Sequence, residues 1–465
     1  MSIVAQITRD TAQRTRFSLT NRVILRAALS VGAAGLIVKA AATCKEIAVA
    51  GVYGRGDAMD AFLAAALIPS LLVNLIAESM NQALVPTLIG VREREGREAA
   101  QHLLSSAMLW LGVLLVAASG AMALAAHIIF PLIASHFPPA KLALSIRLFY
   151  ALLPIVPLTG IATICTSVLN TLGRFTVPAL APLIISVSII AGALILGARF
   201  GIWAMVYSTV AGTLIHVCIV ATMMHRSGYR FSLRWHGMSP PVAQVSRQYG
   251  PVLLSGVVAS GGLLVDQSMA AMLAAGSVSA LVYANRFVSV VLALLAGAIS
   301  TAIVPPISRS IAHHEWQNCR AMLRTWVLNS ATVAVPIAIL LIAFAHPLVR
   351  IALQHGAFSS HDTAVVAEVL AMFAIQIPFF AASRIYYRFL IAMLRTDLVL
   401  YCGVINLLLD IVLNIILMRW FGLPGIALAT SLWTVSTFIF LWYWAYKLLA
   451  RAESSTTTPP AESAI

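Results

Sequence analysis

Long stretches without any acidic or basic side chain constrain this 465-residue chain more than any other feature. Four of them run from Arg147 to Arg174, from Arg174 to Arg199, from Arg286 to Arg309 and from Arg324 to Arg350. A helix needs about 20 mostly apolar residues to cross the hydrocarbon core of a bilayer. Each stretch is long enough for one crossing, so the sequence predicts an all-α polytopic membrane protein.

The composition excludes several classes of protein. Hydrophobic residues make up 60% of the chain and charged residues 10%, which rules out a soluble enzyme, a disordered chain and a disulfide scaffold. No P-loop, HExxH or GxSxG motif is present, so we expect a transporter with no built-in ATPase and no enzymatic activity. Uphill transport would then depend on an ion gradient or the membrane potential.

Gaps between charges, Gly and Pro predict about twelve crossings. They fall near residues 27–52, 60–90, 101–128, 143–170, 176–198, 202–225, 249–274, 279–303, 323–346, 364–390, 398–418 and 425–446.

The distribution of basic residues predicts the orientation. With both termini cytoplasmic, 20 of the 30 Lys and Arg residues lie in inside segments and six in outside loops, as the positive-inside rule requires. The excess of 30 basic over 16 acidic residues is therefore a sign of topology rather than of nucleic-acid binding. The predicted parts are a basic cytoplasmic arm (1–26), two six-helix lobes (27–225 and 249–446), an inter-lobe loop (226–248) and a polar cytoplasmic tail (447–465).

An internal repeat relates the two lobes. Ala83-Leu-Val-Pro86 recurs as Ala302-Ile-Val-Pro305, Gly201 pairs with Gly422, and Leu172 pairs with Leu394, all at offsets of 219 to 222. Because six helices per lobe is an even number, both lobes enter from the same side. The expected symmetry is a pseudo-twofold axis along the membrane normal, with the substrate path between the lobes.

Polar side chains inside the predicted spans are candidates for function, because they are costly in lipid. Helix 1 carries Lys39, Lys45 and Glu46, and helix 8 carries Arg286. Helix 2 carries a stripe of Asn74, Glu78, Asn81 and Gln82. The structural alternatives are snorkelling of Arg286, a partly solvated Lys45–Glu46 pair and hydrogen bonding between helices.

A second group of polar residues could bind a small cation. Asn406, Asp410 and Asn414 follow one another at intervals of one helical turn on helix 11, and Asp266 stands on helix 7. Oxygen-only ligands suit Na⁺ better than zinc or copper. The alternative is a buried network in which one Asp is protonated.

Several ordered motifs resemble the MviN/MurJ lipid II flippases, in the superfamily of polysaccharide exporters and MATE drug antiporters. The matching residues are Gly56-Asp-Ala-Met-Asp60-Ala-Phe62, Ile68-Pro69, Val85-Pro86, Leu169-Asn170-x-x-Gly173-Arg174-Phe175 with Pro178, Ala275-Gly276-Ser-Val-Ser, Val282-Tyr-Ala-Asn-Arg286, His355-Gly356-Ala-Phe358 and Gly425-Ile-Ala-Leu-Ala-Thr430-Ser431.

The resemblance implies two six-helix lobes around a central cavity that carries an undecaprenyl-pyrophosphate-linked sugar outward. Lys45 and Arg286 fall on cationic positions of the family, with Lys39 added as a further pyrophosphate contact, and Glu78 matches an acid of helix 2. Asn74, Glu78 and Asn81 would contact the sugar head group. Where the family has a sodium site, its ligands match Asp266, Asn406, Asp410 and Thr430.

The chain also departs from the family pattern. Gly51 and Val73 stand where many members have arginines, Asn285 replaces an Asp before Arg286, and two C-terminal helices of many members have no counterpart in this sequence. A related lipid-linked oligosaccharide is therefore an alternative to lipid II itself.

The predicted function is an inner-membrane flippase working by alternating access. Its partners would be the lipid-linked glycan, the bilayer and envelope-synthesis enzymes; no cofactor is expected apart from Na⁺ as a coupling ion. Two other functions stay open: a cation-coupled, MATE-like exporter of small molecules, and a non-transporting scaffold of an envelope-synthesis complex.

Overall fold

A computed structural model describes residues 32–457, which contain helices and no strands. This confirms the all-α fold class. The first group comprises the helix 32–53, α2 (Asp57–Leu72), the π-helical turn η1 (Val73–Ala77), α3 (Glu78–Arg94), α4 (Gly96–Ile133), α5 (Pro139–Leu152), α6 (Ile155–Thr171), α7 (Thr176–Leu180), α8 (Leu183–Phe200) and α9 (Trp203–Arg226). Then follow α10 (Pro240–Ala270), α11 (Ser277–Ala312), α12 (Trp316–Ala343), α13 (Ala345–Leu353), α14 (Ser360–Ala374), α15 (Gln376–Ala392), α16 (Thr396–Phe421) and α17 (Leu423–Thr457).

Ten segments of the described chain are long and apolar enough to cross a membrane. They match ten of the twelve predicted crossings, and the helix 32–53 and α10 occupy the positions of the other two. The predicted helices 143–170 and 364–390 are each broken in the middle, into α5 and α6 and into α14 and α15. Pro154 explains the first break, because proline cannot donate the helical hydrogen bond.

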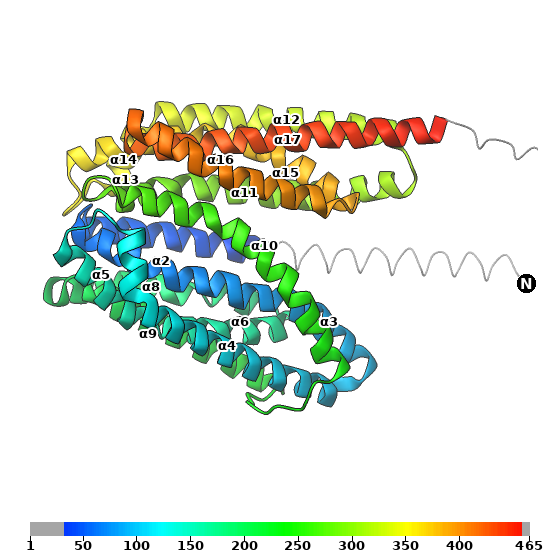
Figure 1. The fold of residues 1–465 in the computed structure, drawn as a ribbon, viewed down its shortest axis with the longest axis horizontal. Helices are drawn as coiled ribbons and strands as arrows, with labels where there is room; N and C mark the ends of the chain where they lie inside the picture. The colour runs from blue at the N-terminus through cyan, green and yellow to red at the C-terminus, as the bar shows by residue number, and fades with distance from the viewer. Residues whose placement is uncertain (1–31, 458–465) are drawn as a thin grey trace, which may run out of the picture.

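The helices form two groups, with α10 running obliquely between them (Figure 1). In the first group α8 packs on α9 and α2 on α5; in the second α16 and α15 pack on α17. The helix α10 contacts α3 of the first group and α16 of the second. The two-lobe arrangement expected from the repeat is therefore present.

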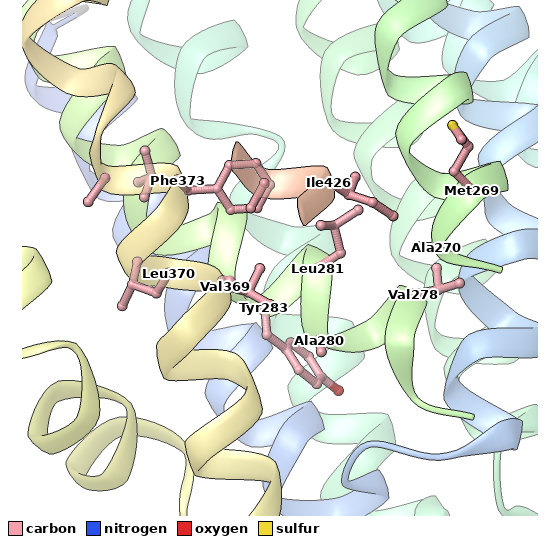
Figure 2. Packing of buried hydrophobic residues seen from close by; sticks show 14 of the residues in the cluster. Met269, Ala270, Val278, Ala280, Leu281, Tyr283, Val369, Leu370, Phe373 and Ile426 are labelled. Carbon is pink, nitrogen blue, oxygen red and sulfur yellow. The ribbon is translucent and has the colours of Figure 1, made fainter. Parts of the chain in front are cut away.

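One apolar core crosses between the groups only at one end of the bundle. In the first group this core contains the end of the helix 32–53, the start of α2, the end of α4 and α5. These residues pack against α11, α14 and α17 of the second group. Figure 2 shows part of this core, where Leu281, Phe373 and Ile426 lie together. A second core, at the opposite end, contains residues of the first group and the start of α10. The lobes are thus closed at one end, which we call the closed end.

Backbone conformation supports the internal repeat. Gly201 ends α8 with φ 53° and ψ −136°, and Gly422 ends α16 with φ 62° and ψ −133°. A positive φ is rare for residues with a side chain, so each position favours glycine. The same backbone angles at two glycines 221 residues apart therefore support the equivalence of the two helix ends. The pairing of Leu172 with Leu394 is wrong by one residue: the left-handed positions are Gly173 (φ 72°) and Leu394 (φ 58°), also 221 apart.

Some predicted boundaries differ from the structure. The inter-lobe loop is shorter than 226–248 because α10 already begins at Pro240, and proline fits the first turn of a helix. The predicted tail is helical to Thr457, because Leu448 and Leu449 are buried and Arg320 pairs with Glu453 at 2.8 Å. The basic arm 1–26 and residues 458–465 lie outside the described range.

Side-specific labelling would test the orientation. His313, after α11, and Ser360, at the start of α14, are both exposed. The positive-inside rule puts Ser360 outside and His313 inside. In intact cells, a single cysteine at 360 should react with a membrane-impermeant maleimide, and one at 313 only after permeabilisation. Labelling of both from the same side would contradict the twelve-crossing topology.

Candidate functional site

Two cations from different lobes share one buried carboxylate. On the helix 32–53, Glu46 Oε1 lies 2.8 Å from Lys45 Nζ, and the same oxygen lies 2.8 Å from Arg286 Nη2 of α11. The Glu46 side chain is 7% exposed, whereas those of Lys45 and Arg286 are 19% and 34% exposed. One carboxylate cannot neutralise two cations, so this charge triad keeps a net positive charge facing open space.

The Arg286 guanidinium has spare hydrogen-bonding capacity. It donates Nη2–H to Glu46, while its Nε is buried and has no partner within residues 32–457. A buried donor without an acceptor is costly. The side chain as a whole is 34% exposed, so an anion at the triad would meet its terminal N–H groups.

Lys39 does not join the triad. It is exposed, and its carbonyl accepts a hydrogen bond from Thr43. Six residues separate Lys39 from Lys45, which is about 240° around an α-helix. The two lysines therefore lie on different sides of the helix.

The polar residues of predicted helix 2 are divided by a π-helical turn. Asn74 lies in η1 and Glu78 starts α3, and both are exposed. Asn81 is half-buried and accepts a 2.6 Å hydrogen bond from Ser167 of α6. Asn74 and Glu78 are therefore free to contact a ligand, whereas Asn81 already holds α3 against α6. A π-turn often marks a functional position in a helix.

Three of the four predicted cation ligands lie together. Asn414 Nδ2 donates to Asp266 Oδ1 at 2.9 Å and to Asp410 Oδ1 at 3.2 Å, and Thr430 Oγ1 donates to Asp266 Oδ2 at 3.2 Å. The cluster therefore joins α10, α16 and α17. Asp410 is 1% exposed and Asn414 is fully buried.

Asn406 occupies a different place. Its amide donates to Thr437 Oγ1 at 2.8 Å, one turn away from the carboxylates along α16. Asn414, on the other side of Asp410, takes the position in the cluster that the sequence assigned to Asn406. The three residues recur every four positions, so the spacing alone could not distinguish Asn406 from Asn414.

The oxygen atoms of this cluster are suitable ligands for a hard cation. Asp410 Oδ2 and Asn414 Oδ1 are buried oxygens without a hydrogen-bond donor in the described part of the chain. Two carboxylates in one buried site repel each other unless a cation or proton neutralises them. Oxygen ligands of this kind suit Na⁺. The cluster has only two carboxylates, and residues 32–457 contain no group of three or more His, Cys, Asp or Glu side chains of the kind that binds transition metals.

Asp60, a buried carboxylate that the sequence did not indicate as a site, joins the two lobes at the closed end. Asp60 of α2 is 1% exposed and accepts hydrogen bonds from the backbone N–H groups of Gly276 (2.7 Å) and Ser279 (2.9 Å) at the start of α11. Lys141 Nζ of α5 lies 3.0 Å from Asp60 and 2.8 Å from Asp57. The sequence did contain one indication of this contact. Asp60 and Lys141 are opposite charges in apolar segments, and isolated charges are costly in a membrane unless they pair with one another.

Further contacts across the lobes surround Asp60. Arg55 Nε donates to Asp362 Oδ1 at 2.8 Å, and Tyr283 donates its hydroxyl to the Gly54 carbonyl at 3.2 Å. Ala357 donates its N–H to the Gly51 carbonyl at 2.8 Å. The closed end is thus a polar latch, formed by Asp60 and these cross-lobe pairs, over the shared apolar core.

Comparison with known proteins places these features in a family. The family model described as lipid II flippase MurJ matches residues 49–460. A relative described as a probable lipid II flippase MurJ, from Buchnera aphidicola subsp. Acyrthosiphon pisum (strain APS), is 23% identical over 90% of this chain and 83% of its own.

Solved structures show the same fold. The inward closed conformation of a lipid II flippase MurJ superposes with a TM-score of 0.77 at 22% identity, over 93% of this chain and 94% of that one. The inward-facing conformation of a MATE multidrug transporter gives 0.73 at 13% identity, over 92% and 100%.

Proposed function

The chain belongs to the MurJ family of lipid II flippases, and from that premise we propose that it carries an undecaprenyl-pyrophosphate-linked glycan across the bacterial inner membrane. The cargo would be lipid II or a related lipid-linked oligosaccharide, for peptidoglycan or surface-polysaccharide synthesis. Such a protein is a multi-pass transporter rather than a catalyst.

The charge triad is the observation that supports this proposal. A pyrophosphate carries several acceptor oxygens and negative charges, and Lys45 and Arg286 present two cations of which Glu46 neutralises one. The Arg286 side chain is 34% exposed, so terminal N–H groups that Glu46 does not use would donate to phosphate oxygens. Because the triad joins both lobes, an anion bound there would contact both at once.

The polar residues near η1 extend the site toward a sugar. Asn74 and Glu78 are exposed and can exchange hydrogen bonds with hydroxyl and amide groups of a glycan. Asn81 would contribute only if it released Ser167. Lys39 lies on another side of its helix and would meet a passing head group rather than hold it in the triad.

Alternating access then requires the closed end to open. The Asp60 contacts and the Arg55–Asp362 pair join the lobes, so an outward-open state must break them. Anion binding at the triad and opening of the latch both involve α11, since Arg286 and the N–H groups bound to Asp60 belong to α11 or the turn before it.

The two alternative functions fit the site less well. An exporter of cationic drugs needs a carboxylate at the centre of its site, but the carboxylate that joins the two lobes, Glu46, is already paired with two cations. A membrane scaffold has no need of a charged cluster that joins two lobes inside the spans.

Reconstitution would test the proposed function directly. Purified protein in vesicles should move a fluorescent undecaprenyl-pyrophosphate-linked sugar between leaflets, measured as accessibility to an external glycosidase or reductant. The undecaprenyl monophosphate analogue should move more slowly because it offers fewer acceptors to the triad. Equal rates with and without protein would refute the proposal.

We also propose that the Asp266, Asp410, Asn414 and Thr430 cluster binds Na⁺ as the coupling ion. If so, Na⁺ should raise the melting temperature of the purified protein, because a ligand of the folded state adds RT ln(1 + [L]/Kd), about 2.7 kcal/mol at a hundredfold excess over Kd. Equal K⁺ should not, since the larger ion fits such a cage poorly. Scanning fluorimetry at constant ionic strength provides the measurement.

Two variants distinguish a sodium site from a structural network. Asp410→Asn retains the size of the side chain but removes its charge, so the Na⁺-dependent shift should vanish. Asn406→Ala, one turn away and bonded to Thr437 instead, should retain the shift. A wild type whose melting temperature ignores Na⁺ would mean that protons or a structural network neutralise the two carboxylates.

A further inference from the structure

The connection between the lobes is a fixed segment rather than a loose linker. Residues 228–239, here called the strap, run between α9 and α10 without helical structure. The amide of Gln101 in α4 binds both backbone groups of one strap residue. Its Nε2 donates to the Arg230 carbonyl at 2.8 Å, and its Oε1 accepts from the Arg230 N–H at 2.9 Å. Arg97 donates to the Gly228 carbonyl.

The far part of the strap is fixed in the same way. The His236 N–H donates to Ser106 Oγ at 3.3 Å, and the His236 ring stacks on that of His102 at 4.2 Å. The strap is therefore bonded to α4 along residues 97–106, which is about 14 Å of that helix.

The side chains of the strap alternate in character. Phe231, Leu233 and Trp235 are apolar and 47%, 54% and 47% exposed. Arg230 precedes them, and Ser232 and Arg234 stand between them; both arginines are exposed. Residues 230–235 have no helical structure. In an extended segment successive side chains point to opposite sides, so this alternation gives the strap one apolar edge and one cationic edge.

The strap lies at the level where a membrane surface is expected. The helix α4 has 38 residues, which makes it about 57 Å long, whereas the hydrocarbon core is about 30 Å thick. The strap follows the N-terminal end of α4, which begins Gly96-Arg97-Glu98 and is too polar for the core. Arg94 and Arg226, at the ends of α3 and α9, add cations at the same end of the lobe.

From this placement we propose that the strap is an interfacial anchor for anionic lipid. Its apolar edge inserts at the boundary between headgroups and acyl chains, and Arg230 and Arg234 bind the acidic headgroups of that leaflet. Large apolar side chains exposed beside arginines are what a membrane interface favours. A soluble protein partner is less suited. Basic residues outnumber Glu93, Glu95 and Glu98 at this end of the lobe, and a net positive charge beside exposed apolar side chains matches an anionic lipid surface.

The anchor also determines which parts of the protein move relative to the bilayer. The strap is bonded to α4 of the first lobe, and Gly237 (φ 84°) lies three residues before the start of α10 at Pro240. Bending is therefore expected at Gly237, so the first lobe stays with the leaflet while α10 moves. The proposal does not depend on which head group the protein transports.

Paired cysteine labels on the full-length protein test the anchor. Leu233→Cys and Ser232→Cys, each in a background without the five native cysteines, would carry a small fluorophore in vesicles with or without phosphatidylglycerol. At 233 we expect loss of quenching by aqueous iodide and strong quenching by lipid with a nitroxide near the headgroup. The label at 232 should show the reverse, because it is on the other edge.

The lipid charge is tested separately. Phosphatidylglycerol should increase lipid quenching at 233 several-fold, and Arg230→Gln with Arg234→Gln should remove that increase. Arg350→Gln, on the exposed face of α13, is the matched control and should leave it intact. Equal iodide quenching at 232 and 233 in every vesicle would overturn the lipid anchor, and so would an increase that survives the double substitution.

Discussion

Transport should fall by roughly 10- to 150-fold when Arg286 is replaced by alanine. A hydrogen bond to a charged group contributes about 1.5–3 kcal/mol, and the guanidinium would offer its remaining terminal N–H groups to the pyrophosphate. Lys45→Ala should lose less, because an ammonium supplies a compact charge and no planar fork. Initial rates in vesicles, normalised to folded protein, would measure the effect.

Two further substitutions define the role of the guanidinium. Arg286→Lys should recover only part of the rate, since one ammonium cannot bind Glu46 and a phosphate with the same geometry. Arg350→Ala, an exposed arginine of α13, should transport normally. A normal rate for Arg286→Ala would remove the triad from the substrate site.

The largest loss of stability is expected for Asp60→Ala. It would leave the ammonium group of Lys141, whose side chain is 6% exposed, with Asp57 alone, and it would leave the N–H groups of Gly276 and Ser279 without an acceptor. Breaking a buried ion pair from one side costs about 3–5 kcal/mol. Thermal unfolding in detergent should therefore occur at a clearly lower temperature than in the wild type.

Asp57→Asn is the matched control for Asp60. Both carboxylates contact Lys141, but the Asp57 side chain is 60% exposed, and an exposed pair contributes about 0–1 kcal/mol. Its melting temperature should stay near that of the wild type. Equal losses for the Asp57 and Asp60 variants would show that the latch depends on charge alone and not on burial.

The milder Asp60→Asn variant tests the latch as a gate. Ser279 is fully buried, so a cysteine there should react slowly with an impermeant maleimide. With Asn at position 60 the closed end should open more often and labelling should accelerate. An unchanged labelling rate would mean that Asp60 supports folding but does not control the opening.

Hydropathy and charge predicted the fold well, because each crossing depends on a local run of residues. The crossings, the two lobes and the glycine pair at 201 and 422 all follow from composition and spacing within single segments. The breaks within predicted helices and the extension of α17 could not be predicted in this way. The continuation of α17 to Thr457 depends on the contact of Glu453 with Arg320, a residue of another helix.

The site could be predicted only in part, because its geometry is set by contacts between helices. Lys45 and Arg286 were selected as costly charges, yet only the folded chain puts Glu46 between them. Asn414 replaces Asn406 in the carboxylate cluster since the tilt of α16 against α10, which the sequence does not encode locally, decides which turn faces Asp266. Asp60 was missed because two of its partners are backbone N–H groups, which residue types do not reveal, and because its third partner, Lys141, lies 81 residues away in the sequence.

The matching turns at Gly201 and Gly422 put α8 and α16 at equivalent positions of the two lobes. The residues of these two helices can therefore be compared one by one. Counting back 221 residues, Asp410 and Asn414 correspond to Ile189 and Ala193, which are buried among apolar neighbours.

Equivalent positions in the two lobes therefore differ in chemistry. The second lobe has an oxygen-lined cluster where the first has apolar packing. Substitutions at 189 and 193 are limited by the volume of the side chain, whereas those at 410 and 414 also change charge or hydrogen bonding. Ile189→Asp with Ala193→Asn would make the two helices match at these positions, but it would bury a carboxylate among apolar side chains.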